Sequence, residues 1–326
     1  MKNKFLKWIV LSVASLFAPL CVSCKGFGND GKLKIVTTIF PEYDWVMNIL
    51  GDKKDAVSVD LLLDNGVDLH SYSPSPKDLV NISKCDLFVY VGGESDEWVD
   101  DALKQANNKN MKVINLMTIL GDRAKEEETI DGMQDDEEEG EEGEEEEKEY
   151  DEHVWLSLKN AEIFVQSINE SLSSLDKDNA EYYSANATSY INSLKSLDAR
   201  YTEAVNNGVQ DTLLFADRFP FRYLVDDYSL KYYAAFKGCS AETEASFETI
   251  TFLANKVDEL GLKSILKIES SDGGIANTVK NATQNKNQTI LTMDSIQSAT
   301  TKEYNNGRNY LSIMEQNLSV LTEALS

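Results

Sequence analysis

Two kinds of hydrophobic pattern alternate along most of the chain. Short β-branched or apolar runs, typical of buried strands, are followed by longer stretches with apolar residues at helical spacing. In the first half this pattern predicts strands at 34–38, 57–63, 86–91 and 112–115, with helices at 41–50, 75–83 and 97–105. Strands that alternate with helices predict a parallel sheet with right-handed crossovers.

A second set of alternating elements follows two long helical runs at 158–175 and 179–206. It contains predicted strands at 212–216, 232–236, 264–268 and 289–293, and helical stretches at 220–227, 246–260, 275–283 and 310–325. The second long run would extend about 42 Å, at about 1.5 Å per residue, which exceeds the width of a small domain. We therefore expect an α/β protein of two similar lobes with mainly parallel sheets, joined by a long backbone helix. The expected boundaries are 33–178 for the N-terminal lobe, 179–208 for the linking helix and 209–326 for the C-terminal lobe.

The first 24 residues have the pattern of a secretory signal of the lipoprotein type. Three lysines precede an apolar run from residue 8 to residue 22, and small residues come just before Cys24. The apolar run is shorter than the roughly 20 residues that a membrane-spanning helix needs. We expect cleavage before Cys24, lipidation of Cys24 and a polar tether over 25–32. The protein would then be extracytoplasmic and anchored to the membrane through its lipid, at the cell surface or in the periplasm.

Charge is distributed unevenly along the 326 residues. Lys and Arg number 31 against 56 Asp and Glu, a net charge of −25. This charge would be repelled by phosphate, so we expect no nucleic-acid partner, and a cation is the natural ligand to consider. Within residues 126–152, 18 are Asp or Glu and one is Lys. Such a run predicts a disordered acidic insert. It could collect cations weakly, or it could be a solvated insertion without a role.

Two cysteines remain after Cys24, namely Cys85 and Cys239. They could pair in an oxidising compartment, but they fall in different predicted lobes. We expect both to be buried, unpaired thiols. A zinc–thiolate site is not expected, because the sequence lacks the close cysteine spacings typical of such sites.

The chain contains two histidines, in the segments DLHSYSPSP (His70) and DEHVWLS (His153). Both are predicted to lie in loops at the ends of strands or helices, where open α/β sheets bind ligands. Imidazole is also the commonest nitrogen ligand for zinc and related metals. Taken singly, each histidine fits a surface or locally hydrogen-bonded side chain at least as well.

Four blocks of sequence resemble the zinc and manganese solute-binding proteins of bacterial ABC importers, the ZnuA, AdcA and TroA group. They are TTIFPEYDWVMNILGDK, DLHSYSPSPKDLVNISKCDLFVYVGG, DEHVWLSLKNA and YLSIMEQNLSVLTEAL, in the order typical of that family. The resemblance implies that His70 and His153 are metal ligands in a cleft between the two lobes.

The resemblance also implies a third ligand and, in part of the family, a fourth. The family's third ligand lies in an HxAFGY-like block. A match without gaps places this ligand at Arg218, whose guanidinium cannot bind a cation. One inserted residue places it instead at Asp217, which we take as the third ligand, with Arg218 as the alternative position and a partner of a nearby carboxylate. Asp294 matches the fourth position, although it would also suit a helix N-cap. Glu244 and Glu269 are reserve ligands.

The resemblance implies a receptor that captures a divalent metal and delivers it to an ABC permease with its ATPase. Two imidazoles favour Zn²⁺, and more oxygen ligands would favour Mn²⁺ as the alternative. We expect a monomer without enzymatic activity. A metallohydrolase would need a general base, and the sequence has no HExxH or comparable spacing. A metal-dependent adhesin lipoprotein is compatible with the same fold.

Overall fold

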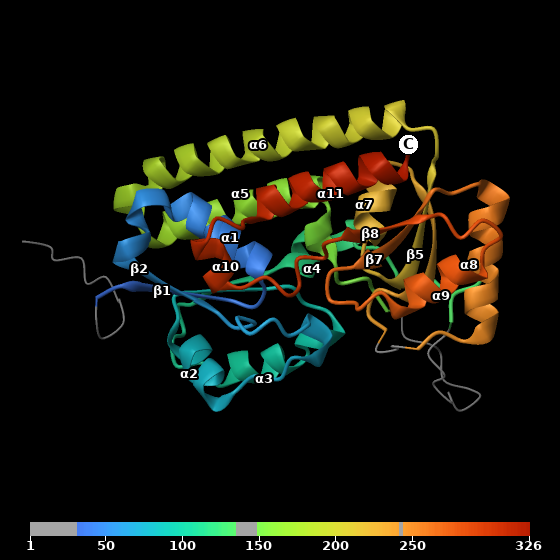
Figure 1. The fold of residues 1–326 in the computed structure, drawn as a ribbon. Helices are drawn as coiled ribbons and strands as arrows, with labels where there is room; N and C mark the ends of the chain where they lie inside the picture. Colours follow the sequence, from blue (N-terminus) through green and yellow to red (C-terminus); the bar gives the residue numbers. More distant parts are fainter. Residues whose placement is uncertain (1–30, 135–148, 241–243) are drawn as a thin grey trace, which may run out of the picture.

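The computed structural model describes residues 31–134, 149–240 and 244–326. The predicted signal peptide with Cys24, most of the tether and the centre of the acidic insert (135–148) lie outside the described residues. The chain forms two lobes, each built on a parallel sheet, and one long helix runs along both (Figure 1). Within the described part of the chain, no helix combines the length and apolar character needed to cross a membrane.

The elements alternate as the hydrophobic pattern predicts. The N-terminal lobe contains strands β1 (Leu33–Thr37), β2 (Val57–Leu61), β3 (Leu87–Tyr90) and β4 (Lys112–Asn115), and helices α1 (Phe40–Leu50), α2 (Pro76–Lys84), α3 (Trp98–Lys104), α4 (Leu116–Leu120) and α5 (Leu158–Leu175). Helix α6 (Ala180–Asn207) links the lobes. The C-terminal lobe contains strands β5 (Thr212–Phe219), β6 (Lys231–Lys237), β7 (Ser264–Ile268) and β8 (Thr289–Met293), and helices α7 (Arg222–Asp227), α8 (Phe247–Leu260) and α9 (Gly274–Ala282). The chain then returns to the N-terminal lobe, where α10 (Thr301–Asn305) lies beside α1, and α11 (Tyr310–Ala324) runs back along α6.

The two sheets have the same topology. The strand orders are β2-β1-β3-β4 and β6-β5-β7-β8, and all six neighbouring pairs are parallel. In each lobe the first strand of the sequence is central and the second lies at the edge. The prediction of two similar α/β lobes with parallel sheets is therefore confirmed.

Each sheet is covered by helices on both faces. Successive side chains of a strand point to opposite faces, and in these strands both sets are apolar, so each face is buried under helices. In β3, Leu87 and Val89 pack into a central core, whereas Phe88 and Tyr90 pack into an outer core under α2 and α3. In the C-terminal lobe the outer core lies under α8 and α9. The central core is continuous across both lobes.

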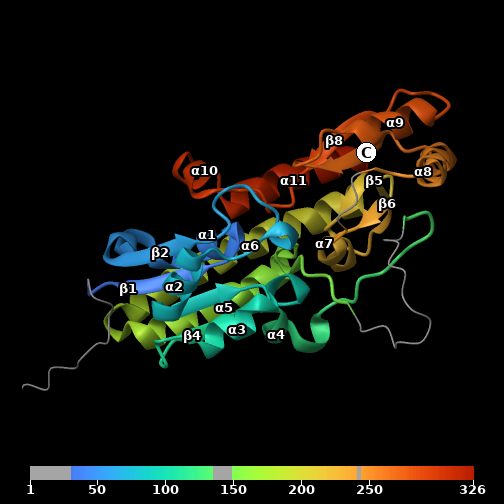
Figure 2. The same ribbon diagram turned by 90° about the horizontal axis from the view of Figure 1, so that it is seen from below.

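Helix α6 is fixed to both lobes by buried side chains. The hydroxyl of Tyr190 donates a 2.8 Å hydrogen bond to Asp44 of α1, and that of Tyr201 donates a 2.6 Å bond to the carbonyl of Met314 in α11. Seen from below, the helix extends from the N-terminal lobe to the C-terminal lobe (Figure 2). These bonds, together with the shared core, favour a fixed arrangement of the lobes over a freely hinged one.

Two details differ from the sequence-based expectation. Strand β5 continues past Ala216 to Phe219, with a break in its register between Phe215 and Arg218. The expectation that all of 126–152 is disordered is wrong for the ends of this segment. Glu126 pairs with Tyr150 in an antiparallel bridge, and the Gln134 amide donates a hydrogen bond to a carbonyl of strand β6. Backbone pairing with the folded protein orders these ends despite their charge.

Candidate metal centre

His70 lies in a single turn of 3-10 helix (Leu69–Ser71) in the loop after strand β2. The carboxylate of Asp68 caps this turn, because its Oδ1 accepts a 3.1 Å hydrogen bond from the amide of His70. On the imidazole, Nδ1 lies 2.8 Å from the hydroxyl of Ser95. Ser95 therefore holds the Nδ1 side of the ring, and Nε2 lies 3.9 Å from Asp68 Oδ1.

His153 lies at the start of a similar turn (Val154–Leu156), just before helix α5. Its imidazole is fully buried. Asp151 Oδ1 accepts a 2.8 Å hydrogen bond from the backbone amide of His153 and lies 3.1 Å from its Nδ1. As at His70, the Nδ1 side of the ring is occupied and the Nε2 side is directed elsewhere.

The two Nε2 atoms point toward each other and lie 3.2 Å apart. A tetrahedral zinc ion with Zn–N bonds of about 2.0–2.1 Å would hold two nitrogens about 3.3 Å apart. Metal-binding histidines also typically have their second ring nitrogen hydrogen-bonded, which fixes the tautomer and the ring orientation. The pair therefore has both the spacing and the outer contacts of two ligands to one metal ion.

Burial and charge affect the two imidazoles in opposite directions. Burial and the neighbouring His153 lower the pKa of His70 to about 3. Burial also acts to lower the pKa of His153, but Asp151 more than compensates, and the net pKa lies above the ordinary value. Without metal, a proton shared by the pair is therefore held mainly on His153, beside Asp151.

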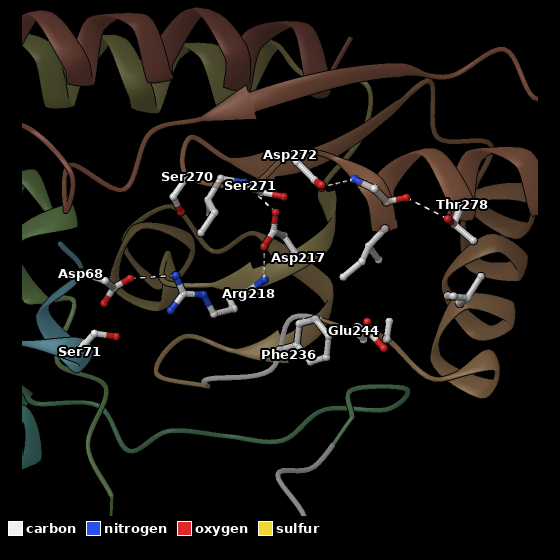
Figure 3. A pocket seen from close by; sticks show the side chains of 15 residues that line it. Asp68, Ser71, Asp217, Arg218, Phe236, Glu244, Ser270, Ser271, Asp272 and Thr278 are labelled. Atoms are coloured by element: carbon white, nitrogen blue, oxygen red, sulfur yellow. Dashed lines mark hydrogen bonds and ion pairs between the residues drawn. The ribbon is translucent and has the colours of Figure 1, made fainter. Parts of the chain in front are cut away.

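Arg218 of strand β5 reaches from the C-terminal lobe to the loop that carries His70. Its Nη2 forms a 2.8 Å ion pair with Asp68 Oδ2, and its Nη1 donates a 3.3 Å bond to the carbonyl of Ser240. The contact with Asp68 borders a cleft of about 790 Å³ between the lobes (Figure 3). The interpretation of Arg218 as a partner of a nearby carboxylate agrees with this geometry.

Asp217 also lines the cleft, but its carboxylate is bound to the backbone of its own lobe. Oδ1 accepts a 2.9 Å hydrogen bond from the Arg218 amide, and Oδ2 accepts a 3.3 Å bond from the Ile268 amide of strand β7. Asp217 lies within strand β5, not after its end as expected. Its role as a ligand stays a prediction.

Two of the other predicted carboxylates, Asp294 and Glu269, also have partners close in space. Asp294 forms an ion pair with Arg308, and its Oδ1 accepts a 2.8 Å hydrogen bond from the amide of Ile296. Glu269 accepts bonds of 2.7 and 2.8 Å from the amide and hydroxyl of Ser295. Glu244 is exposed at the edge of the cleft. Coordination by Asp294, or by the two reserve residues, stays a prediction.

A thiol completes the group of potential ligands around the two histidines. Ligand atoms of His70, His153 and Cys239 all lie within 4.8 Å of one another. The group includes neither Asp217 nor Asp294. Cys239 is half-buried and Cys85 is buried, and neither takes part in a disulfide within the described part of the chain. The expectation of unpaired thiols is thus confirmed, whereas the expectation of burial holds for Cys85 and not for the half-buried Cys239.

The sequence does contain a signal for the residues that support the histidines. An aspartate precedes each histidine by two positions, as Asp68-Leu69-His70 and Asp151-Glu152-His153. In both segments the carboxylate accepts a hydrogen bond from the histidine amide. This Asp-x-His spacing identifies Asp68 and Asp151. Ser95 and Cys239 come from distant segments and have no comparable signal.

Comparison with known proteins identifies one family. The family described as "Zinc-uptake complex component A periplasmic", ZnuA, matches residues 35–324. The zinc-binding lipoprotein AdcA of Streptococcus pneumoniae strain R6 is 34% identical over 322 residues, which are 98% of this chain and 61% of AdcA. The chain thus spans less than two thirds of AdcA. The high-affinity zinc uptake system protein ZnuA of Bacillus subtilis is 32% identical over 98% of both chains.

Solved structures show the same similarity. The Zn(II)-bound ZnuA-like domain of Streptococcus pneumoniae AdcA is 30% identical and has a TM-score of 0.70, covering 90% of this chain and 99% of that domain. The metal-dependent lipoprotein YcdH of Bacillus subtilis is 29% identical with a TM-score of 0.72, covering 90% of this chain and all of YcdH.

Proposed function

The chain belongs to the family of periplasmic zinc-uptake components, and we propose on that basis that it is an extracytoplasmic receptor for Zn²⁺. Zinc is its cargo, bound by the Nε2 atoms of His70 and His153. The observation that carries this proposal is the 3.2 Å approach of these two atoms, with both Nδ1 atoms already in contact with other groups. A fully buried imidazole whose Nε2 faces a second imidazole is not typical of histidines that only interact with solvent.

The donor atoms favour zinc over manganese. Imidazole nitrogen is a good ligand for Zn²⁺, whereas Mn²⁺ prefers sites rich in carboxylate, carbonyl and water oxygens. Asp68 and Asp151, two residues before the histidines, are bound to backbone amides and to Arg218 or His153. Glu152, directly before His153, accepts a hydrogen bond from the Ser95 amide and faces Nδ1 of His70, not its Nε2. Nitrogen therefore dominates the proposed coordination.

The receptor would pass its cargo to an ABC permease that its ATPase drives, without covalent chemistry of its own. Tethering through a lipid on Cys24 would keep it at the membrane surface, beside the permease. It would act there as a monomer, because a single chain supplies both histidines.

Titration of the purified chain with Zn²⁺, in competition with a chromogenic chelator, tests the proposal. We expect one tight site in the wild type, and loss of at least about 100-fold in affinity in His70→Ala and His153→Ala, since outer-shell changes alone cost about 10–100-fold. Asp122→Ala removes an exposed carboxylate of a surface turn and serves as the control.

Circular dichroism and the melting temperature of the metal-free variants would show that they are folded. Unchanged zinc affinity in the folded double variant His70→Ala/His153→Ala would rule out the site. Preferential binding of Mn²⁺ by the wild type would rule out zinc as the cargo.

A further inference from the structure

We propose that Cys239 is the third protein ligand of the bound metal, so that the receptor holds zinc with two imidazoles and one thiolate. This inference rests on the proposed function, because it concerns the same ion. Cys239 would then be the third metal ligand, a position at which a match to the family pattern places Arg218 or Asp217.

The geometry brings the thiol next to the histidine pair. The Cys239 Sγ and one nitrogen of each imidazole lie within 4.8 Å of one another. A tetrahedral zinc ion with a Zn–S bond of about 2.3 Å would hold sulfur and nitrogen about 3.6 Å apart. The sulfur would therefore have to move at most about 1.2 Å closer to the nitrogens to reach this separation. A rotation of the Cys239 side chain or a small movement of its loop can supply this distance.

Several contacts hold the loop with Cys239 against the histidines. The amide of Cys239 donates a 3.2 Å hydrogen bond to Glu127 Oε1, from the ordered start of the acidic segment. Gly238 packs so closely that a Cβ there would lie 3.1 Å from His153 Nδ1 and 3.0 Å from the Phe219 carbonyl. A larger residue at this position would push the loop, and the thiol with it, away from His153.

Arg218 fixes the same loop from the other side. Its guanidinium bonds to the carbonyl of Ser240, next to Cys239, and to Asp68, two residues before His70. One side chain thus joins the thiol-bearing loop to the loop of the first imidazole. Arg218 therefore acts as a positioning residue, since a guanidinium cannot bind the cation.

The alternative third ligand, Asp217, would have to give up existing contacts. Both of its oxygens accept hydrogen bonds from buried or half-buried backbone amides of β5 and β7. Removing this carboxylate from them would leave the amides without partners, which is unfavourable for buried backbone groups. The Cys239 thiol is hydrogen-bonded to the Glu127 side chain and not to a backbone amide, so its movement toward a metal would leave no amide without a partner.

A thiolate ligand has a consequence for selectivity. Sulfur is a soft donor that suits zinc and does not suit manganese. Burial and the nearby Glu127 raise the pKa of the Cys239 thiol, so the metal-free site holds a neutral thiol. Zinc displaces the thiol proton to solvent when the Zn–S bond forms.

Cobalt substitution tests the coordination directly. The full chain would be prepared in a Cys21→Ser/Cys24→Ser background, which leaves Cys85 and Cys239 as its thiols, and loaded with Co²⁺. We expect a thiolate-to-cobalt charge-transfer band in the near ultraviolet, together with the visible bands of tetrahedral Co²⁺. This measurement needs no change at Cys239, so it does not depend on the folding of a Cys239 variant. A cobalt complex without the charge-transfer band would overturn the inference.

Variants at three positions then separate the candidates. In the same background, Cys239→Ser should abolish the charge-transfer band and lower zinc affinity by at least about 100-fold, beyond the loss typical of an outer-shell residue. Cys85→Ala, in the outer core of the N-terminal lobe, is the matched control and should keep both. Asp217→Asn should keep the band.

The result also distinguishes this inference from the proposed function. Tight zinc binding that depends on His70 and His153 but survives in Cys239→Ser would overturn the thiolate ligand and leave the zinc receptor intact. A wild-type chain without tight zinc binding would overturn both.

Discussion

Arg218 and Asp68 form an ion pair of 2.8 Å between the two lobes, at a point two residues from His70. Burial acts to raise the pKa of Asp68, but Arg218 and His70 outweigh it, and the net pKa is lowered. Asp68 uses one oxygen for Arg218 and the other to cap the turn of His70. The ion pair therefore connects the position of a metal ligand to the opposite lobe.

Breaking this ion pair should weaken zinc binding without removing a ligand. Asp68→Asn can still cap the turn of His70 but loses the charge, and Arg218→Ala loses both of its contacts. We expect each to lower zinc affinity by about tenfold, the lower end of what outer-shell changes cost. The loss of zinc-binding free energy in the double variant should be much smaller than the sum of the losses in the two single variants. Chelator competition on all four proteins, analysed as a double-mutant cycle, would measure this difference. Additive losses would mean that the two side chains act independently.

Zinc affinity should fall as the solution becomes more acidic. His70, with a pKa of about 3, stays neutral throughout the accessible range, whereas His153 has a raised pKa and must lose its proton when zinc binds. Below the pKa of His153, we expect the affinity to decrease by about tenfold more per pH unit than above it, because the His153 proton is displaced in addition to any thiol proton and each displaced proton costs about 1.36 kcal/mol per unit. Calorimetry in buffers of different ionisation enthalpy would measure the proton release. Affinity that is flat from neutral to mildly acid pH would contradict the assignment of the proton to His153.

A buried carboxyl near the start of α1 should make stability depend on pH. Glu42 is fully buried, and its Oε2 accepts hydrogen bonds from Thr38 and from the amide of Ile39. Burial and Asp96 raise the pKa of Glu42 to about 8. The folded state therefore keeps a proton that the unfolded state has lost above about pH 4.5, so this residue's contribution to stability falls as pH rises from about 4.5 to about 8.

The matched variant for this effect is Glu42→Gln, which keeps the shape and cannot ionise. We expect the free energy of unfolding of the wild type to decline relative to Glu42→Gln across that pH range, by an amount on the order of a few kcal/mol. Urea unfolding at several pH values would measure the difference. Parallel curves for the two proteins would show that Glu42 is ionised in the folded state or that its pKa is near the ordinary value.

The centre of the acidic insert should hold cations weakly and should not contribute to the tight site. Residues 135–148 contain eleven acidic side chains, and replacing them by Gln and Asn keeps the length of the segment and the contacts of its ordered ends. We expect calorimetry to show the loss of weak sites and an unchanged tight site. Capture should slow only at low ionic strength, where screening is least. Loss of the tight site would mean that this segment supplies a ligand.

The alternation of strands and helices could be predicted from the sequence alone, because each buried element carries its own hydrophobic period. The run at 264–268 and its parallel neighbour at 289–293 illustrate this, since both are strands with the predicted bounds. The two histidines could also be singled out, because the chain has no others and both lie in recognisable loops. Helix α6 followed from a periodic run too long to fit within one lobe.

The partners of these histidines were decided by the tertiary structure. Ser95, Cys239 and Arg218 reach the site from segments far from His70 and His153, and only the packing of the lobes brings them together. The register of β5 had the same origin: its local sequence suggests an end at Ala216, but pairing with β6 extends it to Phe219 and places Asp217 inside the strand. Local periodicity depends on neighbouring residues, whereas a metal site depends on side chains that meet in space, so the first can be inferred from sequence and the second requires the fold.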